Sequence, residues 1–282
     1  MNSGILMNRQ RSLKLTGACL LLVLGGCTRI AQSLYLSGCD RDISNASRAI
    51  DSARDDRQRA TAYSKRGNAY SDKARYCRMF KLVANDEYER MFALAIQDHG
   101  QAVALNQQTA DVYINRGQAY YERATLELPN PKAASRWFDL AAADFEIAIQ
   151  KDPREYRAFD WLGLVHQQNG EPEKAIDDFT KEMALNPLGK ARLNDAYCTV
   201  GSQYHGQKKY EAAAADYRKS IELGGGSDGC ACDPYEPLVA LYTVETRQYD
   251  EAWQVVHLAQ RSHKWLSPEL LERLKKDSGR SN

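Results

Sequence analysis

Few of the features that mark specialised classes of protein occur in this sequence. Its 282 residues include only 8 Pro and 18 Gly, which excludes a collagen-like or low-complexity chain. The 38 Lys and Arg are balanced by 37 Asp and Glu, which argues against a nucleic-acid binder that neutralises phosphates. The apolar stretch from Leu15 to Leu24 has about half the length that a membrane-spanning helix needs. The chain is long enough for one large domain or two small ones.

Motifs of catalysis are also missing. There is no H-E-x-x-H zinc motif, no S-x-x-K and no phosphate-binding P-loop, and the five His are scattered without pairing. Carboxylate pairs such as Asp55-Asp56 and Asp177-Asp178 are expected on solvated helix faces. We therefore predict a protein that is not an enzyme and that binds no cofactor or metal.

The N-terminal region has the pattern of an export signal. Arg9, Arg11 and Lys14 precede the apolar stretch, and no acidic residue occurs in or before it. A basic region followed by about ten apolar residues is typical of a secretory signal. The true start is either Met1 or Met7.

The apolar stretch ends in Leu24-Gly25-Gly26-Cys27, which resembles the lipobox of bacterial lipoproteins. That resemblance implies removal of residues 1–26 as a signal peptide and acylation of Cys27, palmitate included. Thr28, in place of Asp, then points to an outer-membrane anchor with the protein facing the periplasm. The mature chain would carry 35 basic and 37 acidic residues, because three basic residues are discarded. An ordinary cleaved signal is the alternative.

An internal repeat runs through most of the remaining chain. The segment Tyr63-x-x-Arg66-Gly67-x-x-Tyr70 returns four times, the last time in degenerate form. Its steps of three and four residues form one stripe of a helix, and a second striped segment follows each copy. The small residue midway along each first helix allows the second helix to approach closely. The later copies begin at Tyr113, Phe159, Tyr197 and Tyr235, and the second segments are centred on His99, Phe145, Phe179, Tyr217 and Val256.

This pattern resembles the tetratricopeptide repeat (TPR), in which antiparallel helix pairs stack into a right-handed superhelix. The resemblance covers residues 60–261 and implies an all-α solenoid of about five helix pairs; its clearest unit spans residues 156–189. The first two repeats carry extra residues between their helices, which stretch the glycine spacing to 50 and 46 residues. Glu182 and Ser220 stand where the family usually has Ala, so looser or shifted packing is expected there.

Capping helices are predicted on both sides of the repeats. Residues 39–58 carry an apolar stripe and are predicted to form an N-terminal cap, joined to the membrane by a tether over residues 27–38. Residues 265–277 are predicted to form a C-terminal cap, because Leu266, Leu270 and Leu274 step by four. Such helices would cover the apolar face that an open stack exposes.

Five cysteines remain in the chain once Cys19, in the discarded signal, and Cys27 are set aside. Export to an oxidising compartment makes disulfides the first expectation. Cys39 and Cys77 lie 19 residues before and after residue 58, where the turn is predicted. In an antiparallel helix pair those positions are level, so a disulfide between them is sterically reasonable.

A second disulfide is predicted from Cys198 to either Cys230 or Cys232. A metal site at Cys230-Ala231-Cys232 is the weaker interpretation, because no second ligand pair follows at a suitable spacing. A redox pair is weaker still, since the thioredoxin-like context is missing.

Stacked repeats make a concave surface, here called the groove, lined mainly by the first helix of each pair. In TPR proteins the groove binds extended or helical peptide segments, so the resemblance implies protein or peptide partners and no nucleic acid. Counting one or two residues from the core stripe gives the candidates for groove-facing side chains. They are Ser64, Lys65, Asn68, Asn115, Gln118, Tyr121, Arg157, Trp161, Gln168, Thr199 and His205.

The groove can be compared with the carboxylate clamp of chaperone-binding TPR proteins. Asn68 and Asn115 fall at its two Asn positions and Arg157 at one cationic position, but Ser64 and Trp161 occupy the other two. The resemblance therefore implies recognition of peptide backbone and mixed polar groups rather than capture of a C-terminal carboxylate.

These features predict an outer-membrane-anchored TPR adaptor or scaffold that binds envelope proteins through its groove. A pilotin-like assembly factor for a secretin or another outer-membrane complex is the alternative with the same fold. Neither a particular partner nor an oligomeric state follows from the sequence.

Overall fold

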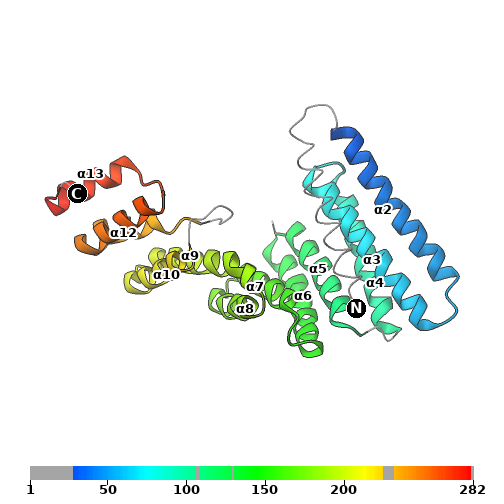
Figure 1. Cartoon of the computed structure of the whole chain (residues 1–282). Helices are drawn as coiled ribbons and strands as arrows, with labels where there is room; N and C mark the ends of the chain where they lie inside the picture. Colours follow the sequence, from blue (N-terminus) through cyan, green and yellow to red (C-terminus); the bar gives the residue numbers. More distant parts are fainter. Residues whose placement is uncertain (1–27, 106–107, 129, 225–231, 281–282) are drawn as a thin grey trace. The chain divides into compact units, whose positions relative to one another are not determined.

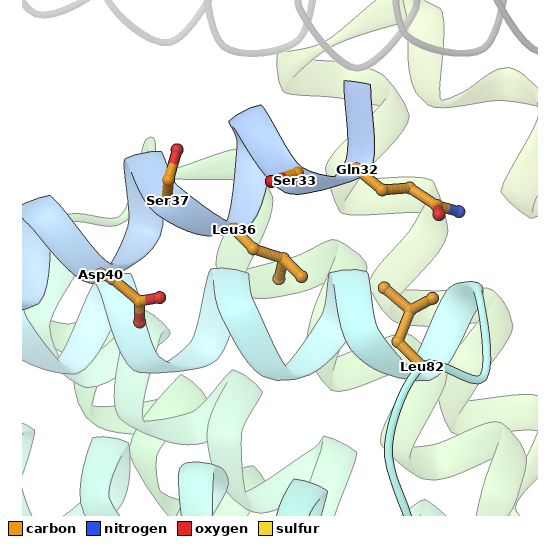
Figure 2. A pocket seen from close by; sticks show the side chains of 6 residues that line it. All are labelled: Gln32, Ser33, Leu36, Ser37, Asp40 and Leu82. Carbon is orange, nitrogen blue, oxygen red and sulfur yellow. The ribbon is translucent and has the colours of Figure 1, made fainter. Parts of the chain in front are cut away.

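The computed structural model describes residues 28–105, 108–128, 130–224 and 232–280. These residues form twelve α-helices, and the described ranges contain no strand, which confirms the all-α prediction (Figure 1). The chain divides into two compact units, Met1–Ala134 and Ser135–Asn282. Each unit is described by itself.

The described part of the first unit contains four complete helices, and each packs against the next one along the chain. α3 and α5, the first helices of the first two repeats, also contact each other. The bounds are α2 (Thr28–Asp51), α3 (Asp56–Met79), α4 (Asn85–Ala104) and α5 (Ala110–Leu126).

The second unit contains the remaining helices. α6 (Pro131–Lys151) begins just before the division, and from α7 onward each α-helix again packs against its successor. A 3-10 turn, η1, precedes α9, and a π-helical turn, η2, follows α11. The bounds are α7 (Tyr156–Gln168), α8 (Pro172–Leu185), η1 (Pro187–Gly189), α9 (Lys190–Gly206), α10 (Tyr210–Glu222), α11 (Tyr235–Ala240), η2 (Leu241–Glu245), α12 (Tyr249–Arg261) and α13 (Pro268–Ser278).

Glycine in the first helix of a pair allows close contact with an aromatic ring of the second. A Cβ added at Gly163 would lie 2.7 Å from Phe179 Cε1, and one added at Gly201 would lie 2.9 Å from Tyr217 Cδ1. Real Cβ atoms do not approach other atoms this closely, so only glycine fits without a rearrangement. The close approach expected from the sequence is therefore present in these pairs.

The fifth helix pair uses a different combination at the same two positions. Val239 replaces the glycine and Val256 replaces the aromatic residue, and both are fully buried in one apolar cluster. These two residues are 17 positions apart, whereas Gly201 and Tyr217 are 16 apart. The π-helical turn η2 lies between the two valines and accommodates the extra residue, as π-bulges do.

The extra residues of the first repeat lengthen its helices. α3 has 24 residues and α4 has 20, whereas α7 and α8 have 13 and 14. Ala74 and Cys77 at the end of α3 pack with Tyr88, Met91 and Phe92 of α4 in a separate apolar cluster. The insertion therefore builds further core between the two helices instead of a loop.

The N-terminal cap differs from the prediction. α2 begins at Thr28, so residues 28–38 of the predicted tether are helical, and the helix ends at Asp51 instead of residue 58. It packs along α3, where Tyr35 stacks on Tyr76 with ring centroids 4.0 Å apart. Sequence periodicity missed this first half because Tyr35 is an aromatic contact outside the apolar stripe.

At the other end of the chain, α13 packs on α12. Leu274 is fully buried and Leu266 is 8% exposed, and both belong to the apolar cluster of the last helix pair. Leu270 and Leu271 pack against the same cluster. α13 thus covers apolar surface of the final repeat.

The two positions at which Ala was expected are tightly packed. Ser220 is fully buried, and its hydroxyl donates to the side-chain oxygen of Asn194 on α9. Glu182 is 4% exposed, and its carboxylate lies against Gly189. The expectation of looser or shifted packing is wrong about looser packing at Ser220, because its hydroxyl, which Ala lacks, is buried in a hydrogen bond with Asn194.

Candidate functional site

The candidate site is the first-helix surface of the repeats, and the two units each carry a part of it. Lys65, Asn68, Asn115, Gln118 and Tyr121 lie on α3 and α5 of the first unit, and Arg157, Trp161, Gln168 and His205 lie on α7 and α9 of the second. The two sets are therefore treated as separate surfaces.

In the first unit, Asn68 and Asn115 are half-buried on two helices that contact each other. Neither side chain forms a hydrogen bond with any part of the chain that the structure describes. Lys65 is exposed and forms no ion pair within the same ranges, whereas Ser64 is 8% exposed and therefore not part of an open groove. A pair of half-buried amides without partners offers two donors and two acceptors to a ligand backbone.

A row of charged residues continues this surface toward the end of α3. Arg75 Nη1 donates to Gln118 Oε1 at 3.4 Å, which gives one predicted residue a partner on the neighbouring helix. Arg78 Nη1 donates to Glu122 Oε2 at 2.8 Å and to Thr125 Oγ1 at 2.7 Å. Sequence reasoning missed Arg75, Arg78 and Glu122 because they lie beyond the repeat pattern, in the extension of α3 and in the last turns of α5.

In the second unit, Arg157 is held by a carboxylate of its own segment. Its Nε and Nη2 atoms donate to the two oxygens of Glu155 at 2.8 and 2.5 Å, and its backbone N–H donates to the same side chain. An external carboxylate would have to displace Glu155. This contact adds a second reason, beside Ser64 and Trp161, for expecting no carboxylate clamp.

The other predicted residues of the second unit are partly used in packing. Trp161 stacks on Phe145 of α6, with ring centroids 6.2 Å apart. His205 meets Tyr210 edge-on at 5.9 Å, and Gln168 is exposed at the end of α7. Thr199, also on α9, bonds its hydroxyl to the carbonyl of Asp195 within the helix. Only Gln168 is an open polar side chain of the kind predicted.

A buried acidic pair lies near the junction of α7, α8 and α9. Burial, and secondarily the neighbouring Asp160 carboxylate, raise the pKa of Glu182 to about 7. Burial also raises the pKa of Asp160, against the opposing effect of Arg192, whose Nε lies 3.1 Å from Asp160 Oδ1. The two carboxyl groups therefore each favour the protonated form more than a free carboxyl group does.

A disulfide joins Cys198 of α9 to Cys232, just before α11, with Cα atoms 6.1 Å apart. The two cysteines are 34 residues apart, so the bond connects successive repeats. Cys230, the other predicted partner, lies outside the described residues, as does Cys27 with the whole signal segment. No cluster of three or more His, Cys, Asp or Glu suited to a metal occurs in the described ranges.

Cys39 and Cys77 are both free thiols in the structure, which contradicts the first predicted disulfide. The side-chain contacts Asp40 with Lys73 and Ser47 with Arg66 set the register of α2 against α3. In this register Cys39 is level with a residue near position 74, about one helical turn from Cys77. The prediction failed because the turn lies at residues 52–55 and not at residue 58. Burial raises the pKa of Cys39 to about 12, so its thiol is unreactive.

Comparisons with known proteins agree on the repeat. A family model described as Tetratricopeptide repeat matches residues 195–223, which cover most of α9 and all of α10. The "Small glutamine-rich tetratricopeptide repeat-containing protein 2" of Saccharomyces cerevisiae is 29% identical over 105 residues, 37% of this chain. The chain spans about a quarter, 26%, of that relative's length.

A similar fold occurs in a solved structure. The S. pombe nuclear import adaptor Nro1 matches with a TM-score of 0.60 at 13% identity, over 88% of this chain and 92% of its own. Pseudomonas aeruginosa pilF matches with a TM-score of 0.40 at 19% identity, over 82% of this chain and 90% of its own. With the paired helices and their glycine–aromatic contacts, the family match and the Nro1 structure show that the described residues form a TPR-like all-helical stack with a tetratricopeptide repeat at residues 195–223. TPR proteins are typically scaffolds and not enzymes.

Proposed function

We propose that this chain is a TPR adaptor of the bacterial envelope, anchored to the outer membrane through Cys27, that captures protein segments on its first helices. The observation that carries the binding function is the pair Asn68 and Asn115, two half-buried amides without internal partners on contacting helices. The backbone of a bound peptide would form hydrogen bonds with both side chains, because each amide can donate and accept.

Two further observations support export and anchoring. The Cys198–Cys232 disulfide suits an oxidising compartment such as the periplasm. Within the described residues no helix is long and apolar enough to cross a membrane. The proposed attachment is the lipid at Cys27. The helix α2 begins at the residue that directly follows this cysteine.

Anchoring is tested by the variant Cys27→Ala, expressed in a Gram-negative host. The expected result is loss of labelled palmitate and a shift of the protein from the membrane to the soluble periplasmic fraction. Unchanged membrane association without a label would overturn the lipid anchor.

Capture is tested by a photo-crosslinking residue at position 65, followed by mass spectrometry of the crosslinked proteins. The double variant Asn68→Ala with Asn115→Ala should abolish the major crosslinks, while helicity and melting stay unchanged. The matched control is Gln97→Ala with Gln101→Ala, two exposed amides on α4. Equal crosslinking in both double variants would overturn the groove assignment, and a secretin as the captured protein would favour a pilotin-like assembly factor.

A further inference from the structure

A hollow of about 530 Å³ lies on the surface of the last helix pair, and sequence reasoning did not identify it. Its walls are Asp233, Glu236, Pro237 and Ala240, with Trp265 from the segment before α13. The first four residues recur at steps of three and four and so share one face of the α11 segment.

This face is equivalent to the groove surface of the other repeats. Pro237 is two residues beyond the repeat tyrosine Tyr235 and Ala240 is five beyond it, as Lys65 and Asn68 are from Tyr63. The same counting applied to the fifth repeat would therefore have placed this face in the predicted groove. Only Trp265 could not have been found in this way, because it comes from outside the repeat.

The walls of the hollow are held in place before any ligand arrives. Cys232, next to Asp233, is bonded to Cys198, and Asp233 Oδ1 accepts a hydrogen bond from the backbone N–H of Tyr235 at 3.0 Å. Trp265 is 68% exposed, but the next residue, Leu266, is buried in the apolar cluster. Because Leu266 is fixed in the core, the ring of Trp265 faces solvent.

The charge of the hollow is unbalanced. Within the described residues neither Asp233 nor Glu236 forms an ion pair with a Lys, Arg or His of this chain. Two carboxylates beside an aromatic face attract a cation in two ways. The carboxylates accept its hydrogen bonds, and the face of the ring attracts its positive charge. A planar guanidinium suits this combination better than any other side chain.

We infer that this hollow binds an arginine side chain, or more weakly a lysine, of a protein segment held on the first helices of the second unit. The inference rests on the proposed function, since it names a specificity site on the first-helix surface of this unit. Pro237 and Ala240 leave room for the aliphatic part of the side chain, while Trp265 covers its face.

The test uses the mature chain with its tryptophans replaced by 5-fluorotryptophan and followed by ¹⁹F NMR. The Trp265 signal is assigned with Trp265→Phe. The probe is acetyl-Gly-Arg-Gly-amide, and its control is the same peptide with citrulline, the neutral isostere of arginine. We expect a saturable shift of the Trp265 signal with the arginine peptide, and at least a tenfold weaker affinity for citrulline.

Variants then separate this site from general electrostatics. Asp233→Asn with Glu236→Gln should weaken arginine binding at least tenfold, whereas Glu211→Gln with Glu269→Gln, exposed carboxylates in the first turns of α10 and α13, should leave it unchanged. Equal shifts with arginine and citrulline, or equal affinities in the two double variants, would overturn the inference. If the crosslinks at position 65 still depend on Asn68 and Asn115, the proposed function survives that failure.

Discussion

The imidazole of His99 faces Gly67 so closely that a Cβ added to the glycine would lie 2.8 Å from Nε2. His99 is fully buried, and neither ring nitrogen has a hydrogen-bond partner in the described part of the chain. Burial, with the nearby charges of Arg116 and Arg75, lowers its pKa to about 3. The ring is therefore neutral in the folded protein and carries an unsatisfied N–H in the core.

We predict that His99→Phe stabilises the protein by about 1–2 kcal/mol at pH 7.5, because it removes an unsatisfied buried N–H. The equivalent residue of the third repeat, Phe179, already packs against a glycine in the same way. Below pH 6.5, His99 binds a proton in the unfolded protein but stays neutral in the folded protein. The stability of the wild type therefore falls as the pH drops from 6.5 toward 3. The increase in unfolding free energy caused by His99→Phe should therefore be about 2 kcal/mol larger at pH 5 than at pH 7.5.

Urea unfolding at the two pH values measures this gain. The mirror variant Phe179→His serves as the control and should destabilise the protein by at least about 1 kcal/mol. A loss of stability in His99→Phe at both pH values would show that the ring nitrogens do have partners.

Glu182 should make the stability of the protein depend on pH in the opposite direction to His99. Its pKa is raised to about 7 from 4.5, so the unfolded state ionises first. The corresponding stability is complete below pH 4.5 and is lost as pH rises through 7. Glu182→Gln should therefore stabilise the protein at pH 8 by up to about 3 kcal/mol relative to its effect at pH 4.5.

Thermal melts across this pH range test the prediction, with the exposed Glu211→Gln as the control. Parallel melting curves for Glu182→Gln and the wild type at every pH would contradict the raised pKa.

The ion pair between Arg66 and Asp98 should matter far more than a surface pair. Arg66 Nε and Nη2 donate to the two carboxylate oxygens at 2.7 and 2.8 Å, and Asp98 is 3% exposed. Arg66→Ala leaves a buried charge and should cost about 3–5 kcal/mol in chemical unfolding. Lys275→Ala, which breaks an exposed pair with Glu272 on α13, should cost less than about 1 kcal/mol. Similar costs for the two variants would contradict this account.

Reduction of the Cys198–Cys232 disulfide should destabilise the second unit. The bond closes a loop over a separation of 34 residues, which corresponds to about 3–4 kcal/mol in the chain-entropy estimate. Hydrogen exchange after mild reduction should therefore speed up in α9–α12 and not in α3–α4. Alkylation of the unreduced, unfolded protein should label Cys39 and Cys77 but neither Cys198 nor Cys232. Labelling at either of the last two would contradict the bond.

The helix pairs could be predicted from the sequence because their contacts repeat. Gly67, Gly163 and Gly201 on first helices each lie opposite a ring of the second helix, so one pattern appears several times along the chain. The first half of α2 and the lengths of α3 and α4 could not be predicted, since Tyr35 stacks on Tyr76 only through a register that no repeat encodes. The same register decides that Cys39 and Cys77 stay apart.

The candidate site, like the fold, could be predicted from the sequence only in part. Counting from the core stripe identified Asn68 and Asn115 as surface amides, because helical periodicity alone decides which face a residue occupies. Counting could not reveal that Glu155 holds Arg157, or that Trp161 packs on Phe145, since both depend on side-chain geometry. Trp265 lies outside the repeats, so its place beside α11 required the structure.

The valine pair of the fifth repeat has a consequence for the evolution of the array. The fourth pair packs a glycine against a ring, Gly201 against Tyr217, whereas the fifth pair places two valines, Val239 and Val256, at the same positions. A recombination that joined a first helix of one kind to a second helix of the other would create either a void or a collision. Helices of the last repeat can therefore be exchanged with those of its neighbours only as whole pairs, which makes the pair, and not the helix, the inherited building block.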